Sequence, residues 1–174
     1  MARLPQRIVC LSTETVEVLY LLGEEARIAG ISGFTTHPPR ARKEKPKVSG
    51  FSSARIERIL AVEPDLVLAF SDLQGDIARD LVKAGVAVHV FNHRSVDGIL
   101  AMIETVGRLV GADARALALV AELEQTIATE RAAGEARAAR LGGRPKVYFE
   151  EWNEPLITGI RWVSELIGIA GGED

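Results

Sequence analysis

The chain has 174 residues, of which 47% are hydrophobic and 26% are charged, with 21 Lys and Arg against 24 Asp and Glu. This balance is typical of a globular protein and excludes the collagen-like, coiled-coil and disordered classes. A net charge of −3 and an aromatic content of 5% provide neither a basic footprint nor a base-stacking surface, so we expect no nucleic-acid partner.

The only cysteine is Cys10, which excludes an intramolecular disulfide. Its place in an apolar run predicts a buried strand residue. The most leucine-rich segment, residues 16–22, is far shorter than the roughly 20 apolar residues that span a bilayer. The first seven residues are polar, and we expect no secretion signal within this chain.

Short apolar runs alternate with helical patterns through the first two thirds of the chain. The apolar runs predict buried strands at residues 7–11, 27–32, 65–70 and 86–91. The helical patterns cover residues 13–22, 54–62, 71–85 and 96–110, the third of them opened by a Ser-x-x-Gln capping box at residues 71–74. Residues 35–47 hold three prolines and five basic residues, which favours an exposed loop. This order predicts an α/β fold, with a parallel sheet covered by helices on both faces.

Residues 112–141 contain no proline and only one glycine, Gly134, and are rich in strong helix formers. We expect one continuous helix from Asp113 to Leu141. Its apolar stripe lies in the first half, which favours a helix that bridges two lobes. A new β-α unit follows, with a strand at residues 146–152, a loop at 153–161 and a helix at 162–169. The expected organisation is a Rossmann-like lobe (1–111), a bridging helix (112–143) and the start of a second, incomplete α/β lobe (144–174).

Ligands of such folds bind at the carboxyl ends of the strands. The loops expected there are residues 12–15, 33–39, 50–53, 71–74 and 92–95. They supply four candidate ligand-binding residues: Thr13, Ser71, Asp72 and His93.

Four segments in order resemble the substrate-binding proteins of ABC importers for vitamin B12 and iron-siderophore complexes. They are the opening residues 7–17, the segment Lys47-Val-Ser-Gly-Phe51, the run Ile56-Glu-Arg-Ile-Leu-Ala-Val-Glu-Pro-Asp-Leu-Val67, and the late Lys146-Val-Tyr-Phe with Thr158-Gly159 and Gly171-Gly-Glu-Asp174. The resemblance implies two Rossmann-like lobes joined by one long helix, with ligand held in the cleft between them. Relatives usually continue for about one hundred residues more, and here the second lobe is expected to be truncated.

The resemblance also assigns roles to particular side chains. Phe51 stands where relatives place an aromatic ring against the ligand, and His37 stands where they carry an aromatic before prolines. Trp152 is expected to face the cleft. Glu57 stands where relatives place a glutamate that pairs with arginines of the membrane permease.

The implied ligand is cobalamin or a ferric siderophore, or else haem, with no intrinsic cofactor and no metal site. The implied partners are an ABC permease and its ATPase, and the implied location is the periplasm or cell surface. Since no leader is seen, a cytosolic corrinoid-binding or regulatory protein remains an alternative.

No dinucleotide fingerprint, P-loop or nucleophile elbow occurs, so we expect no enzyme. The enzymatic alternative is a small α/β domain that uses Ser12, Glu14 or Asp72. We also expect a homodimer, because the partial lobe presents an open strand edge and an apolar helix face.

Overall fold

The computed structural model describes residues 4–174, so the first three residues of the expected N-terminal lobe lie outside the described part. The chain forms two compact units. Unit 1 comprises residues up to Asn92 together with Ile103–Ala116, and unit 2 comprises His93–Met102 together with Leu117–Asp174. The division into three segments that the sequence suggests stays a prediction.

Unit 1 is built on a five-stranded sheet in the order β3-β2-β1-β4-β5, and every neighbouring pair is parallel. The strands are β1 (Ile8–Cys10), β2 (Ile28–Ser32), β3 (Lys47–Ser49), β4 (Leu66–Phe70) and β5 (Val88–Phe91). The predicted α/β class with a parallel sheet is confirmed. The strands β1 and β4 are buried at every residue, as a parallel sheet covered on both faces requires.

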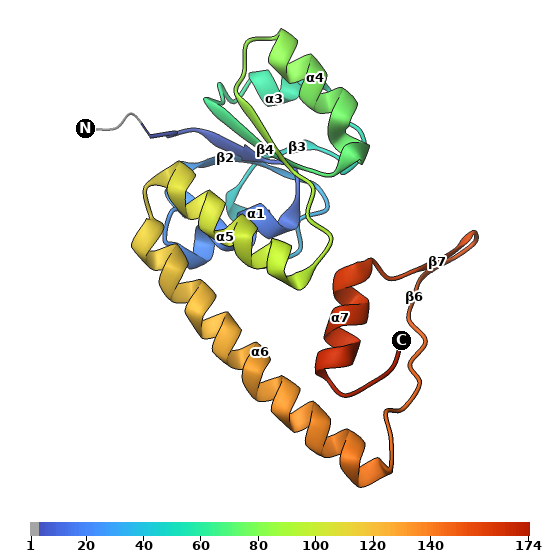
Figure 1. Cartoon of the computed structure of the whole chain (residues 1–174). Helices are drawn as coiled ribbons and strands as arrows, with labels where there is room; N and C mark the ends of the chain where they lie inside the picture. Colours follow the sequence, from blue (N-terminus) through green and yellow to red (C-terminus); the bar gives the residue numbers. More distant parts are fainter. Residues whose placement is uncertain (1–3) are drawn as a thin grey trace. The chain divides into compact units, whose positions relative to one another are not determined.

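Helices cover both faces of this sheet (Figure 1). Two helices, α3 (Ile56–Leu60) and α4 (Gly75–Lys83), lie on one face, and α1 (Thr13–Leu21) lies on the other together with residues 103–110 of α5 (Val96–Val110). The α3/α4 face holds a core cluster of Val9, Leu11, Val48, Ile59, Val67, Ala69, Ile77 and Leu81. Since side chains alternate along a strand, Cys10 points to the opposite face. It is fully buried there, and burial raises the pKa of its thiol to about 12.

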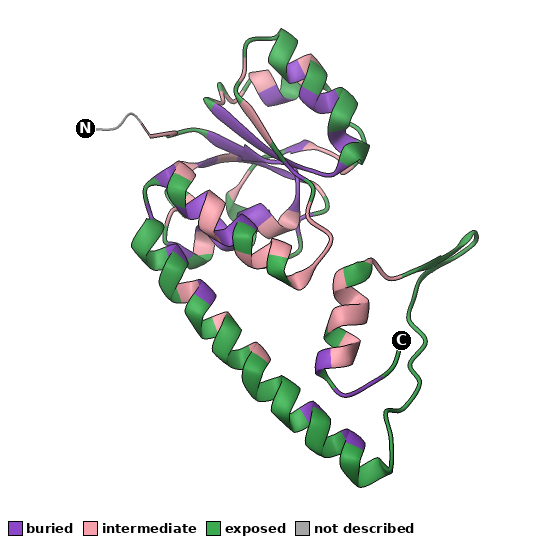
Figure 2. Ribbon diagram, viewed as in Figure 1, coloured by how far each residue is buried: buried purple, intermediate pink, exposed green. Residues whose placement is uncertain are grey.

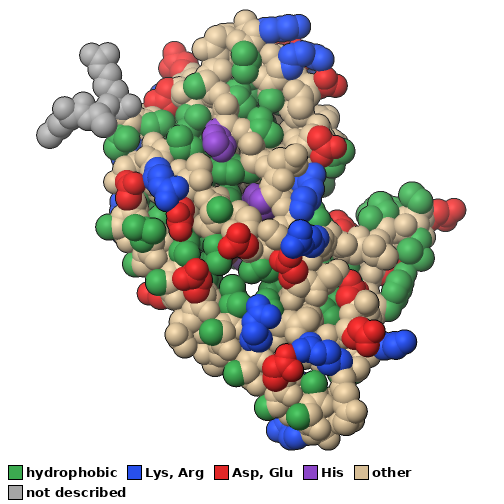
Figure 3. Space-filling model, in the orientation of Figure 1, with side chains coloured by type: hydrophobic (Ala, Val, Ile, Leu, Met, Phe, Trp, Pro, Cys, Tyr) green, Lys and Arg blue, Asp and Glu red, His purple; other side chains and the backbone are tan. Residues whose placement is uncertain are grey.

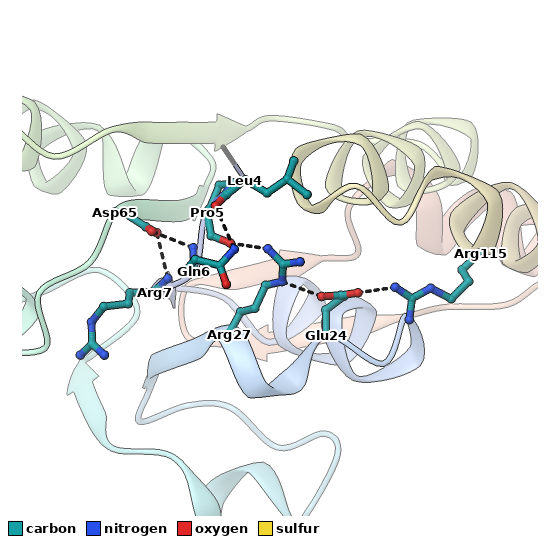
Figure 4. A network of polar contacts seen from close by, with 8 residues as sticks. All are labelled: Leu4, Pro5, Gln6, Arg7, Glu24, Arg27, Asp65 and Arg115. Atoms are coloured by element: carbon teal, nitrogen blue, oxygen red, sulfur yellow. Dashed lines mark hydrogen bonds and ion pairs between the residues drawn. The ribbon is translucent and has the colours of Figure 1, made fainter. Parts of the chain in front are cut away.

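A polar network closes the amino-terminal edge of the sheet (Figure 4). The Asp65 carboxylate accepts hydrogen bonds from the backbone N–H groups of Gln6 and Arg7, at 2.7 and 2.9 Å. Glu24 pairs with both Arg27, at 2.6 Å, and Arg115. These contacts fix the entry to β1 and β4, so this edge of the sheet is occupied by structural interactions.

The long helix is present as predicted: α6 runs without a break over Asp113–Leu141, a length of 29 residues. At about 1.5 Å per residue it is roughly 43 Å long. Most of its residues are exposed (Figure 2). Gly134 is buried, and a Cβ at this position would fall 2.3 Å from the carbonyl oxygen of Ile169. This glycine therefore serves a close approach to the end of α7 (Arg161–Ile169), not a helix break.

Three expectations about local structure are wrong in detail. The expected loop at 35–47 contains the short helix α2 (Ala41–Glu44) and ends at the first residue of β3. The helix expected over 54–62 is shortened to α3, because Ala54 forms an antiparallel bridge with Ser49. The capping box is not formed: the Ser71 hydroxyl accepts from the N–H of Leu73, and the Gln74 side chain bonds elsewhere.

The expected strand at 146–152 and the loop after it are replaced by a hairpin in unit 2. Its strands, β6 (Glu150–Asn153) and β7 (Leu156–Thr158), pair antiparallel around a tight turn. Lys146 instead forms a parallel bridge with Glu173, on the far side of α7. The chain thus returns through α7 to run parallel to Lys146, and the two segments are paired by a single bridge.

Candidate functional site

The carboxyl edge of the sheet in unit 1 is the candidate binding site. Strand order reverses between β1 and β4, because the chain proceeds outward through β2 and β3 and then returns to the other side of β1. At such a switch point the loops after two adjacent strands diverge and leave a crevice, which is where ligands of open α/β sheets bind.

Gln74 holds three parts of this edge together. Its side chain is fully buried, and its Oε1 accepts from the N–H of Phe70 at 2.9 Å. Its Nε2 donates to the carbonyls of Leu11, at 3.1 Å, and Phe51, at 2.8 Å. One amide group thereby fixes the ends of β1 and β4 and the loop that carries Phe51. The Ser-x-x-Gln spacing by itself predicts only a capping role for Gln74.

Hydrogen bonds also connect the loops after β2 and β3. The Ser32 hydroxyl donates to the carbonyl of Gly50 at 3.2 Å and accepts from the N–H of Phe34 at 3.2 Å. The Thr13 hydroxyl donates to the carbonyl of Phe34 at 3.4 Å. Phe34 itself is 68% exposed, so it is a second aromatic ring at this edge, and no motif in the sequence distinguishes it.

Ser71 follows β4 with a φ of 66°, a left-handed conformation that is strained for a residue with a side chain. Its N–H donates to the carbonyl of Phe91 at 2.7 Å. Ser71 is buried, and its hydroxyl accepts from the N–H of Leu73. Backbone strain of this kind concentrates at functional sites. Asp72, the next residue, is exposed at the start of a short 3-10 turn, η2 (Asp72–Gln74).

The structure therefore brings four of the predicted ligand residues to one edge of unit 1: Thr13, Phe51, Ser71 and Asp72. His37 lies in the loop after β2, where it is exposed and its Nδ1 lies 3.3 Å from the Thr36 hydroxyl. Their roles toward a ligand stay predictions.

The other two predicted residues belong to unit 2. The His93 ring lies against the ring of Trp162, with 5.7 Å between centroids. Trp152 is 61% exposed on β6, and its indole N–H donates to the carbonyl of Glu154 at 3.0 Å. Trp152 thus offers an open aromatic face, whereas His93 is engaged by a neighbouring ring.

Unit 2 has a hollow of its own, a cavity of about 590 Å³ among the start of α5, the middle of α6 and α7. Glu165 lies at its wall and accepts from the N–H of Val96, at 2.7 Å, and from Arg161, at 2.7 Å. The backbone hydrogen bond from Val96 and the pairing with Arg161 lower the pKa of Glu165. This carboxylate therefore caps the first turn of α5.

Glu57, the predicted docking residue, is exposed on α3, as expected. Within residues 4–174 there is no group of three His, Cys, Asp or Glu side chains arranged to hold a metal ion. None of the helices in that range is both long and apolar enough to cross a bilayer.

Comparison with known proteins gives one consistent result. The profile of a family described as periplasmic binding protein matches residues 8–174. The cobalamin-binding protein of Halobacterium salinarum is 30% identical over 173 residues, which cover 98% of this chain and 46% of that protein. The vitamin B12-binding protein of Vibrio campbellii is 31% identical over 177 residues, which cover 97% of this chain and 60% of that protein. The chain thus spans about half the length of these curated relatives.

Solved structures agree on the fold. The periplasmic vitamin B12-binding protein of Vibrio cholerae superimposes with a TM-score of 0.79 at 22% identity, over 97% of this chain and 65% of that one. A periplasmic heme-binding protein from Pseudomonas aeruginosa superimposes with a TM-score of 0.76 at 25% identity, over 84% of this chain and 53% of that one. With a family match over nearly all of its length, this chain belongs to the periplasmic binding protein family.

Proposed function

We propose that the chain is the substrate-binding part of an ABC importer and holds a cobalamin or ferric-siderophore type of ligand, with haem as the third candidate. The observation that carries the proposal is the carboxyl edge of the sheet at the β1/β4 switch point, where Gln74 fixes the loop of Phe51. The names of the relatives support this class of ligand. We place the activity in the periplasm or at the cell surface, as in the family.

The side chains at this edge suit binding better than catalysis. Large flat ligands are held mainly by apolar and aromatic contact with a few polar groups, and the edge offers the rings of Phe34 and Phe51 with the hydroxyl of Thr13. The enzymatic alternative needs an accessible nucleophile or base. Ser12 is only 3% exposed, which argues against it in that role. Asp72 and Glu14 are not buried and stay the residues that this alternative would use.

The ligand is tested by titrating cyanocobalamin, haemin and ferrichrome into the chain in a calorimeter. One of the three is expected to bind, and Phe51→Ala is expected to weaken that ligand about tenfold, since an aromatic contact contributes on the order of 1 kcal/mol beyond its buried area. Leu21→Ala, which removes an equally apolar but 61% exposed side chain on α1, is the matched control. If no probe binds, or if both variants bind as the unaltered chain does, the proposal fails.

Glu57 is proposed to dock a permease through its exposed carboxylate. Glu57→Ala is expected to change the free energy of unfolding by less than about 0.5 kcal/mol, as exposed substitutions do, and to reduce stimulation of the cognate importer's ATPase in proteoliposomes. Glu122→Ala, an exposed carboxylate on α6, should leave that stimulation unchanged. A stability loss several times larger would make Glu57 a structural residue.

We also propose that the isolated chain self-associates through unit 2. Large apolar side chains are exposed on the hairpin and the segment before it, namely Tyr148, Phe149, Trp152, Leu156 and Ile157. An apolar patch that is open to water favours association. Light scattering at low micromolar concentration is expected to give a dimer that Ile157→Lys returns to a monomer. A monomer near the chain mass of 18.8 kDa would contradict this.

A further inference from the structure

A second, polar cavity lies at the outer edge of unit 1, next to β3. Its volume is about 440 Å³, and its lining includes Lys47, Arg55 and Arg58, the hydroxyl residues Ser49 and Ser53, and no acidic residue. Elsewhere the signs are mixed: acidic and basic side chains are interspersed over the face shown in Figure 3. A cavity with three cations and no anion is distinctive in a chain whose net charge is −3.

The two arginines of this cavity are free to bind. Within residues 4–174, no hydrogen bond or ion pair involves the guanidinium group of Arg55 or of Arg58. Other exposed arginines of unit 1 are paired: Arg79 binds Asp76 at 2.7 Å, and Arg108 binds Glu104 at 2.6 Å. Two unpaired guanidinium groups that line one cavity leave its positive charge uncompensated.

The walls of the cavity are fixed by the backbone. The chain turns sharply after β3: the N–H of Gly50 donates to the carbonyl of Ser53 at 2.8 Å, and Ser49 bridges Ala54 in antiparallel fashion. The Cβ of any larger residue at Gly50 would fall 2.9 Å from the Ser53 hydroxyl. The closed turn therefore fixes the backbone from Ser49 to Ala54, so that less backbone freedom is lost when a ligand binds.

The polar donors of the cavity are partly unused. The Ser49 hydroxyl is shielded from solvent and has no hydrogen-bond partner among the described residues, an expensive condition for a buried hydroxyl. Lys47 donates through its ammonium group to the carbonyl of Arg42, and an ammonium has two further donors. The cavity thus presents the N–H donors of its three cations and the hydroxyl of Ser53, with no carboxylate in its lining to accept from them, and the unpaired Ser49 hydroxyl lies beneath its surface.

We propose that this cavity binds a phosphate-type oxyanion. Guanidinium groups match the oxygens of a phosphoryl group in bidentate geometry, and a lysine with serine hydroxyls completes such a site. The oxyanion is either free phosphate or the phosphate of an anionic lipid headgroup. The cavity adjoins the loop of Phe51 through Gly50 and Ser53, but none of its cations is among the predicted ligand residues. The proposal therefore stands whether or not the chain binds a corrinoid or a siderophore.

The test follows the amide signals of Gly50 and Ser53 by ¹⁵N NMR while inorganic phosphate is added at constant ionic strength with sodium chloride. Saturable shifts are expected. Arg55→Gln with Arg58→Gln is expected to weaken phosphate binding at least about tenfold, the usual loss for a charge-assisted hydrogen bond. The matched control, Arg79→Gln with Arg108→Gln, removes the same charge from exposed sites and should bind phosphate as the unaltered chain does.

A second arm separates the two sources of phosphate. Sedimentation with phosphatidylglycerol vesicles, compared with phosphatidylcholine vesicles, shows whether a headgroup occupies the cavity. Pelleting with the anionic vesicles that the Arg55/Arg58 double variant abolishes assigns the lipid, and phosphate binding without pelleting assigns the free ion. Thermal melting in phosphate-free buffer checks that both double variants fold. The proposal is overturned if neither probe binds, or if the control pair weakens binding as much as the Arg55/Arg58 pair.

Discussion

The strands β4 and β7 are both largely apolar, yet one is buried and the other is exposed to solvent. All five residues of β4 are buried in unit 1, whereas all three residues of β7 are exposed in unit 2. In unit 1, neighbouring strands and two layers of helices surround β4. In unit 2, β7 pairs only with β6, which is itself exposed. An apolar run thus predicts a strand, but the layers around it decide whether it contributes hydrophobic stabilisation.

The largest expected effect compares one leucine from each strand. Leu68→Ala removes a fully buried side chain from β4 and should lower the free energy of unfolding by about 3–5 kcal/mol, through lost burial and the remaining cavity. Leu156→Ala, at a side chain that is 61% exposed, should change it by less than about 0.5 kcal/mol. Urea denaturation measures both. Equal losses would mean that the hairpin of unit 2 is covered in solution.

The next largest effect compares a buried glutamine of unit 1 with an exposed glutamine of α6. Gln74→Met leaves the N–H of Phe70 and the carbonyls of Leu11 and Phe51 without their partner, and should cost about 2–4 kcal/mol. Gln125→Met, on the exposed surface of α6, provides the control. Chemical denaturation measures stability. Ligand titration of the folded variant measures how far ligand binding depends on the hydrogen bonds of Gln74 that hold the loop of Phe51. A variant as stable as the control would show that Gln74 is dispensable.

Two glycines of unit 2 should respond in opposite directions to the same substitution. Gly134→Ala places a methyl group 2.3 Å from the carbonyl oxygen of Ile169, and is expected to destabilise unit 2 by about 1–3 kcal/mol despite the better helix propensity of alanine. At Gly168, no atom would lie within 4 Å of the new Cβ, so alanine should stabilise α7 by up to about 1 kcal/mol. Hydrogen exchange of the α7 amides reports both changes. Stabilisation by Gly134→Ala would mean that α6 and α7 are not in close contact there.

The smallest effect is a dependence on pH in unit 2. The folded-state pKa of Glu165 is lowered by the hydrogen bond from Val96 and by Arg161, so its contribution to stability is present above the ordinary glutamate value of about 4.3 and is lost as the pH falls through the lower folded value. Glu165→Gln should therefore flatten the acid limb of the stability curve below about pH 4.3. Hydrogen exchange at the start of α5 is the readout, with the exposed Glu130→Gln as the control. If the unaltered chain and both variants lose stability equally at acid pH, Glu165 is not the origin of that loss.

The sequence by itself determined the elements whose stability is local. The bounds of α5 and, within a residue, those of α6 follow from helical periodicity, helix-forming residues and the glycine that ends each pattern. Buried parallel strands such as β4 are equally evident, because a strand covered on both faces must be continuously apolar. The parallel α/β class follows from the order of these elements, and the family resemblance follows from the four sequence segments that carry it.

Only the tertiary structure decided what depends on partners distant in the chain. Gln74 bonds to Leu11, 63 positions away, and no local pattern distinguishes that role from a helix cap. β3 is a strand because β2 lies beside it, and the closed turn at Gly50 places two unpaired arginines around one cavity. Gly134 looks like a weak point in a helix until the end of α7 is placed against it. Hydrogen bonds and close contacts between distant segments form only when the whole chain has folded, so spacing along the sequence does not encode them in readable form.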